Sequence, residues 1–350
     1  DAPTHERAQA QALGAGRTQA DAEAERVHGV LAAAGLSARR VRPVGRDAQV
    51  VDFGRALSVT QAETLAAQLR LRPDVAWVEP NTREPLLAVR TPTDPLFART
   101  ATQAGQWWMY TSGGAGAAAL AERRQGVPNL QTAWSTSTGS SSAVVAVLDT
   151  GITTHGDLAG RVLPGYDFVS EVAVANDGNG RDADPSDPGD WVSDADVFND
   201  PDNFDGCEVS DSTWHGTRIA GMLAARTNSG GYAAGIQWNG RVLPVRVAGK
   251  CGASVADIVD GMRWAAGLPV TGVPANSNPA RVVNISFGGT GSCSVYVETI
   301  ADLKAAGVIV VAAAGNQAAG PSRPAKCAGV VGVVALNRDG FKAYYSNFGS

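Results

Sequence analysis

The stretch Val144-Val145-Ala146-Val147-Leu148-Asp149-Thr150-Gly151 decides the fold class of this chain. Five consecutive apolar residues without polar alternation are typical of a strand that is buried on both faces of a sheet. Asp149 follows directly, which places a carboxylate at the carboxyl end of the strand. Ligands of open parallel sheets bind beyond this edge, so the residues that follow each strand are the candidates for function.

Three further apolar runs follow along the chain and cover residues 241–247, 281–285 and 307–314. Stretches with helical character alternate with them and cover residues 216–225, 254–266 and 295–306. Apolar strands that alternate with helices indicate a parallel sheet covered on both faces. The sequence therefore predicts an α/β fold for the larger part of the chain.

The composition is that of a globular protein. Of the 350 residues, 44% are hydrophobic and 18% are charged, and 41 are glycines without a three-residue period, which excludes a coiled coil, a disordered acidic chain and collagen. The sequence has no dense Lys/Arg patch and no apolar run long enough to span a bilayer, so we expect neither nucleic acid nor a membrane as partner. The length predicts two or three domains of about 150 residues each.

The first 90 residues differ from the rest because they contain no lysine and no cysteine. Their pattern predicts a helix over 18–34, one or two strands over 40–53, and a short strand over 74–78. Ser58 followed by Gln61 resembles a capping box, which predicts a second helix that ends near residue 71. We expect residues 18–82 of a first domain (1–90) to form a small α/β sandwich, followed by a linker over 91–106 and a large domain over 107–350.

Four cysteines lie in the second half of the chain, at Cys207, Cys251, Cys293 and Cys327. An even number favours two disulfides and an oxidising compartment, although four cysteines allow three pairings. A zinc site is the alternative, but it needs closely spaced ligand pairs, and no two of these cysteines are close in sequence.

Two motifs combine into a candidate catalytic pair. Asp149 stands at a strand end, and His215 stands at the start of a helix in Trp214-His215-Gly216-Thr217. Each alone has an ordinary explanation, as a loop cap or a structural histidine. Together they form the base half of a nucleophilic triad, in which the carboxylate fixes the imidazole tautomer. Protonation of His215 is expected to abolish activity near or below pH 6.5, about the pKa of an unperturbed histidine.

Two further strand ends carry residues with chemical potential. Gly288 and Gly289 expose backbone that an extended substrate could pair with as an added strand, although a loop or bulge is the alternative. Asn316 follows the run that ends in Ala314-Gly315, and its amide can donate to a developing oxyanion, although Gly-Asn is also common in turns.

In this order the motifs resemble the subtilisin-like serine peptidases, in particular a secreted bacterial branch with disulfides and an acidic insert. The resemblance rests on the segments VAVLDTGITTHGDL, WHGTRIAGMLAA, LPVRV, NISFGG, AAAGN and YYSNFGS. It implies a subtilisin-like fold over 107–350, secretion, a monomer, and polypeptide substrates. It further implies that Asp149 orients the imidazole, that His215 is the general base and that Asn316 donates to the oxyanion.

The resemblance also implies the remaining parts of the site. Ser286, Phe287 and Gly288 would line the substrate cleft beside the residue that precedes the scissile bond, and Gly252, Ala253, Ser254 and Val255 would form the facing edge strand. Cys207 would pair with Cys251, and Cys293 with Cys327. The first domain resembles the inhibitor-type propeptide of the family at residues 73–80, which implies a ferredoxin-like α+β propeptide that inhibits the enzyme intramolecularly and is cleaved within 86–92.

One element of the family pattern is missing. The family's nucleophile lies in a Gly-Thr-Ser-x-Ala stretch tens of residues after Gly-Asn, and residues 1–350 contain no such stretch. Ser350 belongs to the turn Asn347-Phe348-Gly349-Ser350 and is not the nucleophile. We therefore expect a catalytic domain that is incomplete at its C-terminus, with the serine beyond residue 350, so that this chain alone is inactive. A non-catalytic relative that binds peptides is the alternative.

An acidic segment at 171–211 contains thirteen acidic residues and one basic residue, Arg181. Oxygen side chains at alternate positions around glycines predict a calcium loop, with a solvated acidic loop as the alternative. The candidate ligands are Asp177, Asn179, Asp182, Asp184, Asp187 and Asp190. The family resemblance adds a structural calcium site at Asp157 and Asn228, joined by Asp94.

Overall fold

The computed structural model describes residues 21–45, 48–84, 106–109, 125–130, 133–134, 137–227 and 234–349. The chain divides into two compact units, Asp1–Thr82 and Arg83–Ser350. The predicted cleavage region at 86–92 and the predicted linker up to residue 105 lie outside the described residues, as do Asp94 and Asn228.

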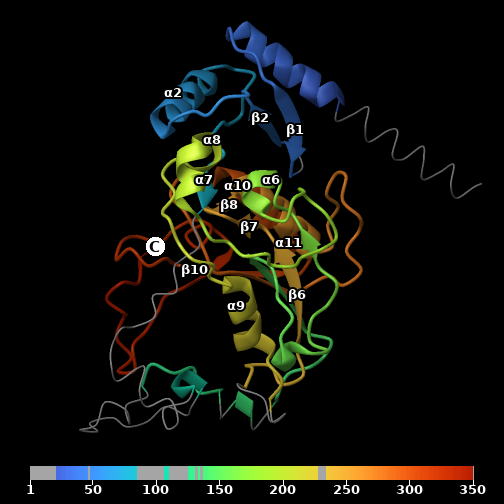
Figure 1. The fold of residues 1–350 in the computed structure, drawn as a ribbon, viewed down its shortest axis with the longest axis vertical. Helices are drawn as coiled ribbons and strands as arrows, with labels where there is room; N and C mark the ends of the chain where they lie inside the picture. The colour runs from blue at the N-terminus through green and yellow to red at the C-terminus, as the bar shows by residue number, and fades with distance from the viewer. Residues whose placement is uncertain are drawn as a thin grey trace, which may run out of the picture. The chain divides into compact units, whose positions relative to one another are not determined.

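The first unit has the predicted helices and a two-stranded sheet (Figure 1). Residues 21–33 are helical, and β1 (Arg40–Val44) pairs antiparallel with β2 (Ala48–Asp52). α2 (Val59–Arg70) begins at the predicted capping box. The Ser58 hydroxyl accepts from the Gln61 N–H at 3.2 Å, and the Gln61 side chain accepts from the Ser58 N–H at 2.9 Å.

The predicted strand at 74–78 was wrong, since these described residues form turns and irregular backbone. The Val75 N–H donates to the carbonyl of Arg72 at 3.2 Å, and the carbonyl of Val78 accepts from the Arg70 guanidinium at 2.6 Å. These backbone groups are bonded to the end of α2, so they are not free to pair with a neighbouring strand.

The second unit contains a six-stranded parallel sheet in the order β11-β10-β9-β4-β6-β5. Its four central strands are the predicted ones, namely β4 (Val144–Asp149), β6 (Arg241–Arg246), β9 (Val282–Ile285) and β10 (Ile309–Ala313). β5 (Tyr166–Asp167) and β11 (Val330–Val333) at the edges were not predicted. The α/β fold class is confirmed.

Helices cover both faces of this sheet. α9 (His215–Ala224) packs its Ala220 and Ala224 against Val147, whereas Gly261 of α10 (Val255–Ala265) lies against Leu148. Successive residues of a strand point to opposite faces, so α9 and α10 lie on opposite sides of β4. α11 (Ser294–Ala305) packs beside α10. No helix among the described residues has the length and apolar character needed to cross a membrane.

Among the described residues, the second unit also contains short helices and a second sheet. The short helices are η1 (Trp107–Met109), η3 (Gly156–Leu158), α6 (Val172–Ala175), α7 (Asp194–Asn199) and α8 (Pro201–Phe204). A second sheet joins β3 (Arg83–Glu84), β8 (Gly252–Ser254) and β7 (Ala248–Gly249) in antiparallel order.

Two disulfides are present, Cys207–Cys251 and Cys293–Cys327. This is the pairing that the family resemblance implied. The first joins the residues after α8 to the turn between β7 and β8, and the second joins the start of α11 to the segment before β11. The two disulfides join cysteines 44 and 34 residues apart in sequence.

Candidate active site

The carboxylate of Asp149 is held at the carboxyl edge of the sheet. Asp149 is the last residue of β4, lies opposite Arg246 in the β4–β6 pairing, and is fully buried. The N–H of Thr150 donates to its Oδ1 at 2.9 Å. Because β4 is buried between two strands, this side chain has a fixed position.

His215 is the first residue of α9, and its Nδ1 lies 2.7 Å from Oδ1 of Asp149. The preceding Trp214 has a left-handed backbone, with φ of 51°, which turns the chain into the helix. Gly216 makes the close approach possible. A Cβ at this position would overlap the carbonyl of Gly151 and lie 3.1 Å from Cβ of Asp149. The structure therefore brings the two predicted residues into hydrogen-bond contact.

The surroundings of His215 raise its pKa above the ordinary value of 6.5. Burial by itself lowers the pKa, but the hydrogen bond and the negative charge of Asp149 outweigh it, with a further contribution from Asp190. The sequence predicted that His215 is protonated near or below pH 6.5. The raised pKa instead places this protonation above pH 6.5.

Asn316 follows β10 at the same edge of the sheet and is half-buried. Its loop is held by Asn347, a buried residue near the C-terminal end of the described residues. The Asn347 amide donates to the carbonyl of Ala314 at 3.1 Å, and its Oδ1 accepts from the N–H groups of Gln317 and Ala319 at 2.8 and 3.0 Å. Asn347 lies in the YYSNFGS segment that matches the family, but the sequence alone assigned it no role.

The residues after β9, whose place in the substrate cleft stays a prediction, are buried or already hydrogen-bonded. Phe287 is fully buried, so its ring belongs to the core. Gly289 exchanges two backbone hydrogen bonds of 3.0 Å with Arg323, so its backbone is already paired, in line with the loop alternative. A Cβ on Gly288 would lie 2.6 Å from the carbonyl of Arg323. Ser286 is half-buried and its hydroxyl accepts from Asn284 at 2.9 Å.

The facing strand accepts an extended segment. β8 contains Gly252, Ala253 and Ser254, and it pairs antiparallel with β3, with Arg83 opposite Ser254 and Glu84 opposite Ala253. Val255 was wrongly placed on this strand. The Ser254 hydroxyl accepts from the N–H of Asp257 at 3.1 Å and caps α10, so Val255 is already its first residue.

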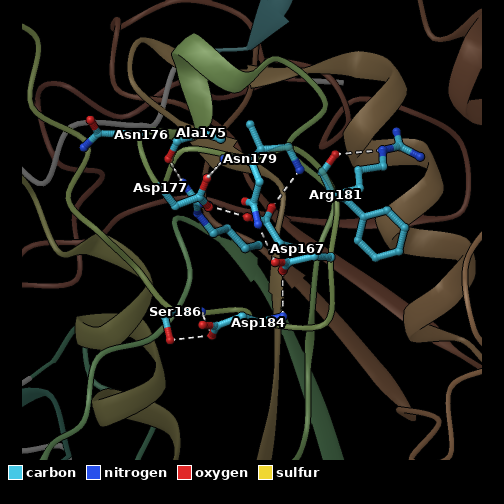
Figure 2. A network of polar contacts seen from close by, with 12 residues as sticks. Asp167, Ala175, Asn176, Asp177, Asn179, Arg181, Asp184 and Ser186 are labelled. Carbon is cyan, nitrogen blue, oxygen red and sulfur yellow. Dashed lines mark hydrogen bonds and ion pairs between the residues drawn. The ribbon is translucent and has the colours of Figure 1, made fainter.

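The carboxylates of the acidic segment bind protein donors. Asp177 bonds with Arg246, Asp182 accepts from Asn179, Asp184 from Ser186, Asp187 from Thr150 and Asp190 from Thr213. Figure 2 shows the part of this network around Asp167 and Asp177. Across the described ranges, no group of three or more His, Cys, Asp or Glu side chains is arranged to hold a metal ion. Calcium binding by the six expected ligands stays a prediction, and in the structure the five carboxylates among them bond with arginine, amide and hydroxyl donors.

Two arginines, the buried Arg246 and the partly buried Arg181, bind carboxylates in and around the acidic segment. Nη1 of Arg246 bonds with Asp167 and, at 2.5 Å, with Asp177, while Nη2 donates to the carbonyl of Ala175. Arg181, the one basic residue of the segment, binds Asp257 and Asp260 of α10 at 2.6 and 2.7 Å. These ion pairs connect the segment to the sheet and to α10. Of the second proposed calcium site, only the buried Asp157 lies in the described residues.

A histidine held by a buried carboxylate beyond a parallel sheet is an arrangement used by serine hydrolases. The chain belongs to the subtilase family, peptidase S8, whose model matches residues 140–350. It is 42% identical over 318 residues to an extracellular protease of Xanthomonas campestris pv. campestris (90% of this chain, 50% of the relative). It is 38% identical over 320 residues to an extracellular basic protease of Dichelobacter nodosus (91% and 49%).

The chain spans about half the length of these curated relatives. Among solved structures, a protease from Pseudoalteromonas arctica matches with a TM-score of 0.59 and 49% identity, over 64% of this chain and 65% of that protein. The family resemblance deduced from the motifs is thereby confirmed.

Proposed function

We propose that the protein containing this chain is a secreted serine endopeptidase of the subtilase family. The observation that carries the proposal is the 2.7 Å contact between His215 Nδ1 and the buried Asp149 carboxylate at the carboxyl edge of the sheet. Membership of the subtilase family and the extracellular proteases among the relatives support it. Two disulfides fit an oxidising compartment outside the cytosol.

Each residue of the proposed site has a distinct role. The neutral ring of His215 accepts the proton of the serine nucleophile at Nε2 and later gives it to the leaving amine. Asp149 keeps the proton of the neutral ring on Nδ1 and stabilises the imidazolium that forms. Asn316 donates its side-chain amide to the oxyanion of the tetrahedral intermediate. The nucleophile is proposed to lie in a Gly-Thr-Ser-x-Ala stretch beyond residue 350, so that residues 1–350 alone do not hydrolyse peptides.

The first domain is proposed to be a propeptide that inhibits the same molecule. Residues 83–84 follow directly on the first unit in sequence, and as β3 they pair antiparallel along one edge of β8. An extended segment on this edge fits the way in which an added strand pairs with a peptide-binding sheet. We further propose that the protein is a monomer.

A fluorophosphonate probe distinguishes this proposal from its alternative. Covalent labelling of the full-length protein, abolished when His215 is replaced by Ala, is the expected result. The alternative, a non-catalytic module that binds peptides on β8, is supported by the pairing of β8 with an extended segment. Peptide binding without any labelling would favour that alternative.

The pH dependence of peptide hydrolysis is expected to follow the protonation of His215. Because the pKa of this residue is raised, kcat/KM falls as the pH drops through a value above 6.5. The measurement is a pH–rate profile of kcat/KM for a peptide substrate whose own charge is constant over the range. An acid limb well below pH 6.5 would contradict the assignment.

Replacement of Asn316 by Ala is expected to lower kcat by about 10²–10³, the loss typical of one oxyanion donor. KM is expected to change little, since the amide is used in the transition state. Steady-state kinetics test this, with Asn337→Ala as a control that removes an amide from an exposed turn. Equal kinetics for the two variants would refute the role of Asn316.

Calcium remains a proposal for the site at Asp157. A buried carboxylate is a suitable ligand for a hard cation, and the family resemblance adds Asn228 and Asp94. If calcium binds there, chelation is expected to lower the unfolding temperature, and Asp157→Asn is expected to abolish the difference between calcium and chelator. Differential scanning calorimetry with and without chelator measures this, and an identical unfolding temperature would count against bound calcium.

A further inference from the structure

The first turn of α9 is capped by two threonine hydroxyls from outside the helix. N–H groups in a first helical turn have no intrahelical partner. In α9, the His215 N–H donates to Oγ1 of Thr213 at 3.2 Å, and the Gly216 N–H donates to Oγ1 of Thr150 at 3.0 Å. Trp214 at the N-cap makes no side-chain hydrogen bond to the helix.

Each of these hydroxyls donates its own proton to a buried carboxylate. Thr150 donates to Oδ2 of Asp187 at 2.7 Å, and Thr213 donates to Oδ2 of Asp190 at 2.7 Å. The two aspartates are 7% and 6% exposed. A hydroxyl has one proton to donate, so a carboxylate that takes it leaves the oxygen lone pairs free for another donor. The carboxylates thereby fix both hydroxyls in the acceptor orientation that α9 needs.

The two carboxylates are themselves held in place. Oδ1 of Asp187 accepts from the N–H of Gly189 at 2.9 Å, and the Asp187 N–H donates to the carbonyl of Ile152 at 3.1 Å. Oδ1 of Asp190 accepts from the N–H of Thr213 at 2.6 Å. Negative charge near a helix N-terminus is also favourable to the helix dipole. The acidic segment thus connects β4 and α9, the two elements that carry Asp149 and His215.

We propose that Asp187 and Asp190 are positioning residues for His215. Acting through Thr150 and Thr213, they hold the first turn of α9 so that the imidazole meets the carboxylate of Asp149. This inference rests on the proposed function, because only a catalytic base needs the ring at this position. Neither aspartate touches the reacting atoms. The sequence placed both in a calcium loop, whereas the structure uses their oxygens as acceptors for the two threonines.

The test compares Asp187→Asn and Asp190→Asn with Asp194→Asn in the full-length protein. An amide keeps the size of the side chain but has one acceptor oxygen, so it cannot serve both donors that each aspartate serves. We expect kcat to fall about 10–100-fold with KM within about threefold, since a small displacement of a catalytic group affects the chemical step. Asp194 is exposed on the same segment, and its variant matches the loss of charge. Unchanged kcat in folded Asp187→Asn and Asp190→Asn proteins would overturn the proposal.

Thr213 provides a second pair of variants that distinguishes positioning from folding. Thr213→Val removes the hydroxyl at nearly constant volume, and Thr213→Ser restores it. We expect Thr213→Val to lose kcat as Asp190→Asn does, and Thr213→Ser to recover the larger part of it. Equal kcat for Thr213→Val and Thr213→Ser would count against a role of the Thr213 hydroxyl in positioning His215.

Backbone hydrogen exchange gives a readout that does not depend on peptidase activity. The amides of residues 215–216 are expected to exchange at least tenfold faster in Asp187→Asn and Asp190→Asn than in Asp194→Asn, while amides at the end of α9 keep their rates. If the wild-type protein proves to have no peptidase activity, the proposed function fails, and the exchange rates still decide the role of the two aspartates. Unchanged exchange of the residue 215–216 amides in Asp187→Asn and Asp190→Asn would overturn the positioning role of the two aspartates.

Discussion

Asp149→Asn is expected to lower kcat of the full-length enzyme by about 10⁴ while the fold stays intact. The carboxylate of Asp149 accepts a hydrogen bond from the Nδ1–H of His215 over 2.7 Å, which leaves Nε2 free to act as the base. An asparagine amide at this position presents N–H groups to the ring. The ring must then carry its proton on Nε2, where it cannot accept the proton of the nucleophile.

Steady-state kinetics on a peptide substrate, with circular dichroism to verify folding, measure this effect. Asp202→Asn is a matched control because Asp202 is exposed on α8. The variant is also expected to lose the raised pKa of His215, because the hydrogen bond and charge of Asp149 are its causes. A fall of less than tenfold in a folded variant would show that Asp149 does not orient the base.

Arg246→Leu is expected to have the largest effect on stability, a loss of about 3–5 kcal/mol in the free energy of unfolding. The Arg246 side chain is 1% exposed, and it binds Asp167, Asp177 and the carbonyl of Ala175. Leucine fills part of the volume, but it leaves the buried Asp167 carboxylate without its cation. The cost of an unpaired buried charge exceeds that of a lost surface ion pair.

The loss of stability in Arg246→Leu is expected to depend on pH. Burial raises the pKa of Asp167 to about 7, although the charge of Arg246 opposes the rise. Without Arg246 the pKa rises further. A carboxyl group whose pKa is higher in the folded state than in the unfolded state makes the folded protein less stable as the pH rises. This loss builds up between the pKa of the unfolded state and the pKa of the folded state. The difference in the free energy of unfolding between Arg246→Leu and wild type should therefore widen above pH 7 and narrow below it.

Denaturant unfolding at about pH 6 and about pH 8.5 measures this difference. Arg241→Leu is the matched control, since Arg241 is exposed at the other end of the same strand. The double variant Arg246→Leu, Asp167→Leu is expected to recover part of the loss, because it removes the unpaired charge as well. Equal stabilities of Arg246→Leu and Arg241→Leu would refute the role of this ion pair.

The central sheet could be predicted because its strands are buried on both faces. Such strands are continuous apolar runs, and the run at 144–148 became β4 with an end within one residue of the prediction. The edge strand β5 has two residues, too few for a periodic signal. The expected strand at 74–78 failed because local apolar residues do not reveal whether a partner strand is available.

By itself, the sequence determined the sheet, the family, and the pair of Asp149 and His215, because strand ends and helix starts lie next to each other in a parallel α/β fold. It could not determine what the acidic segment binds. A row of carboxylates suits a calcium ion and an arginine equally well, and the donors Arg246, Thr150 and Thr213 all lie outside the segment. Only the tertiary structure brought these donors to the carboxylates, because folding places side by side residues that lie apart in the sequence.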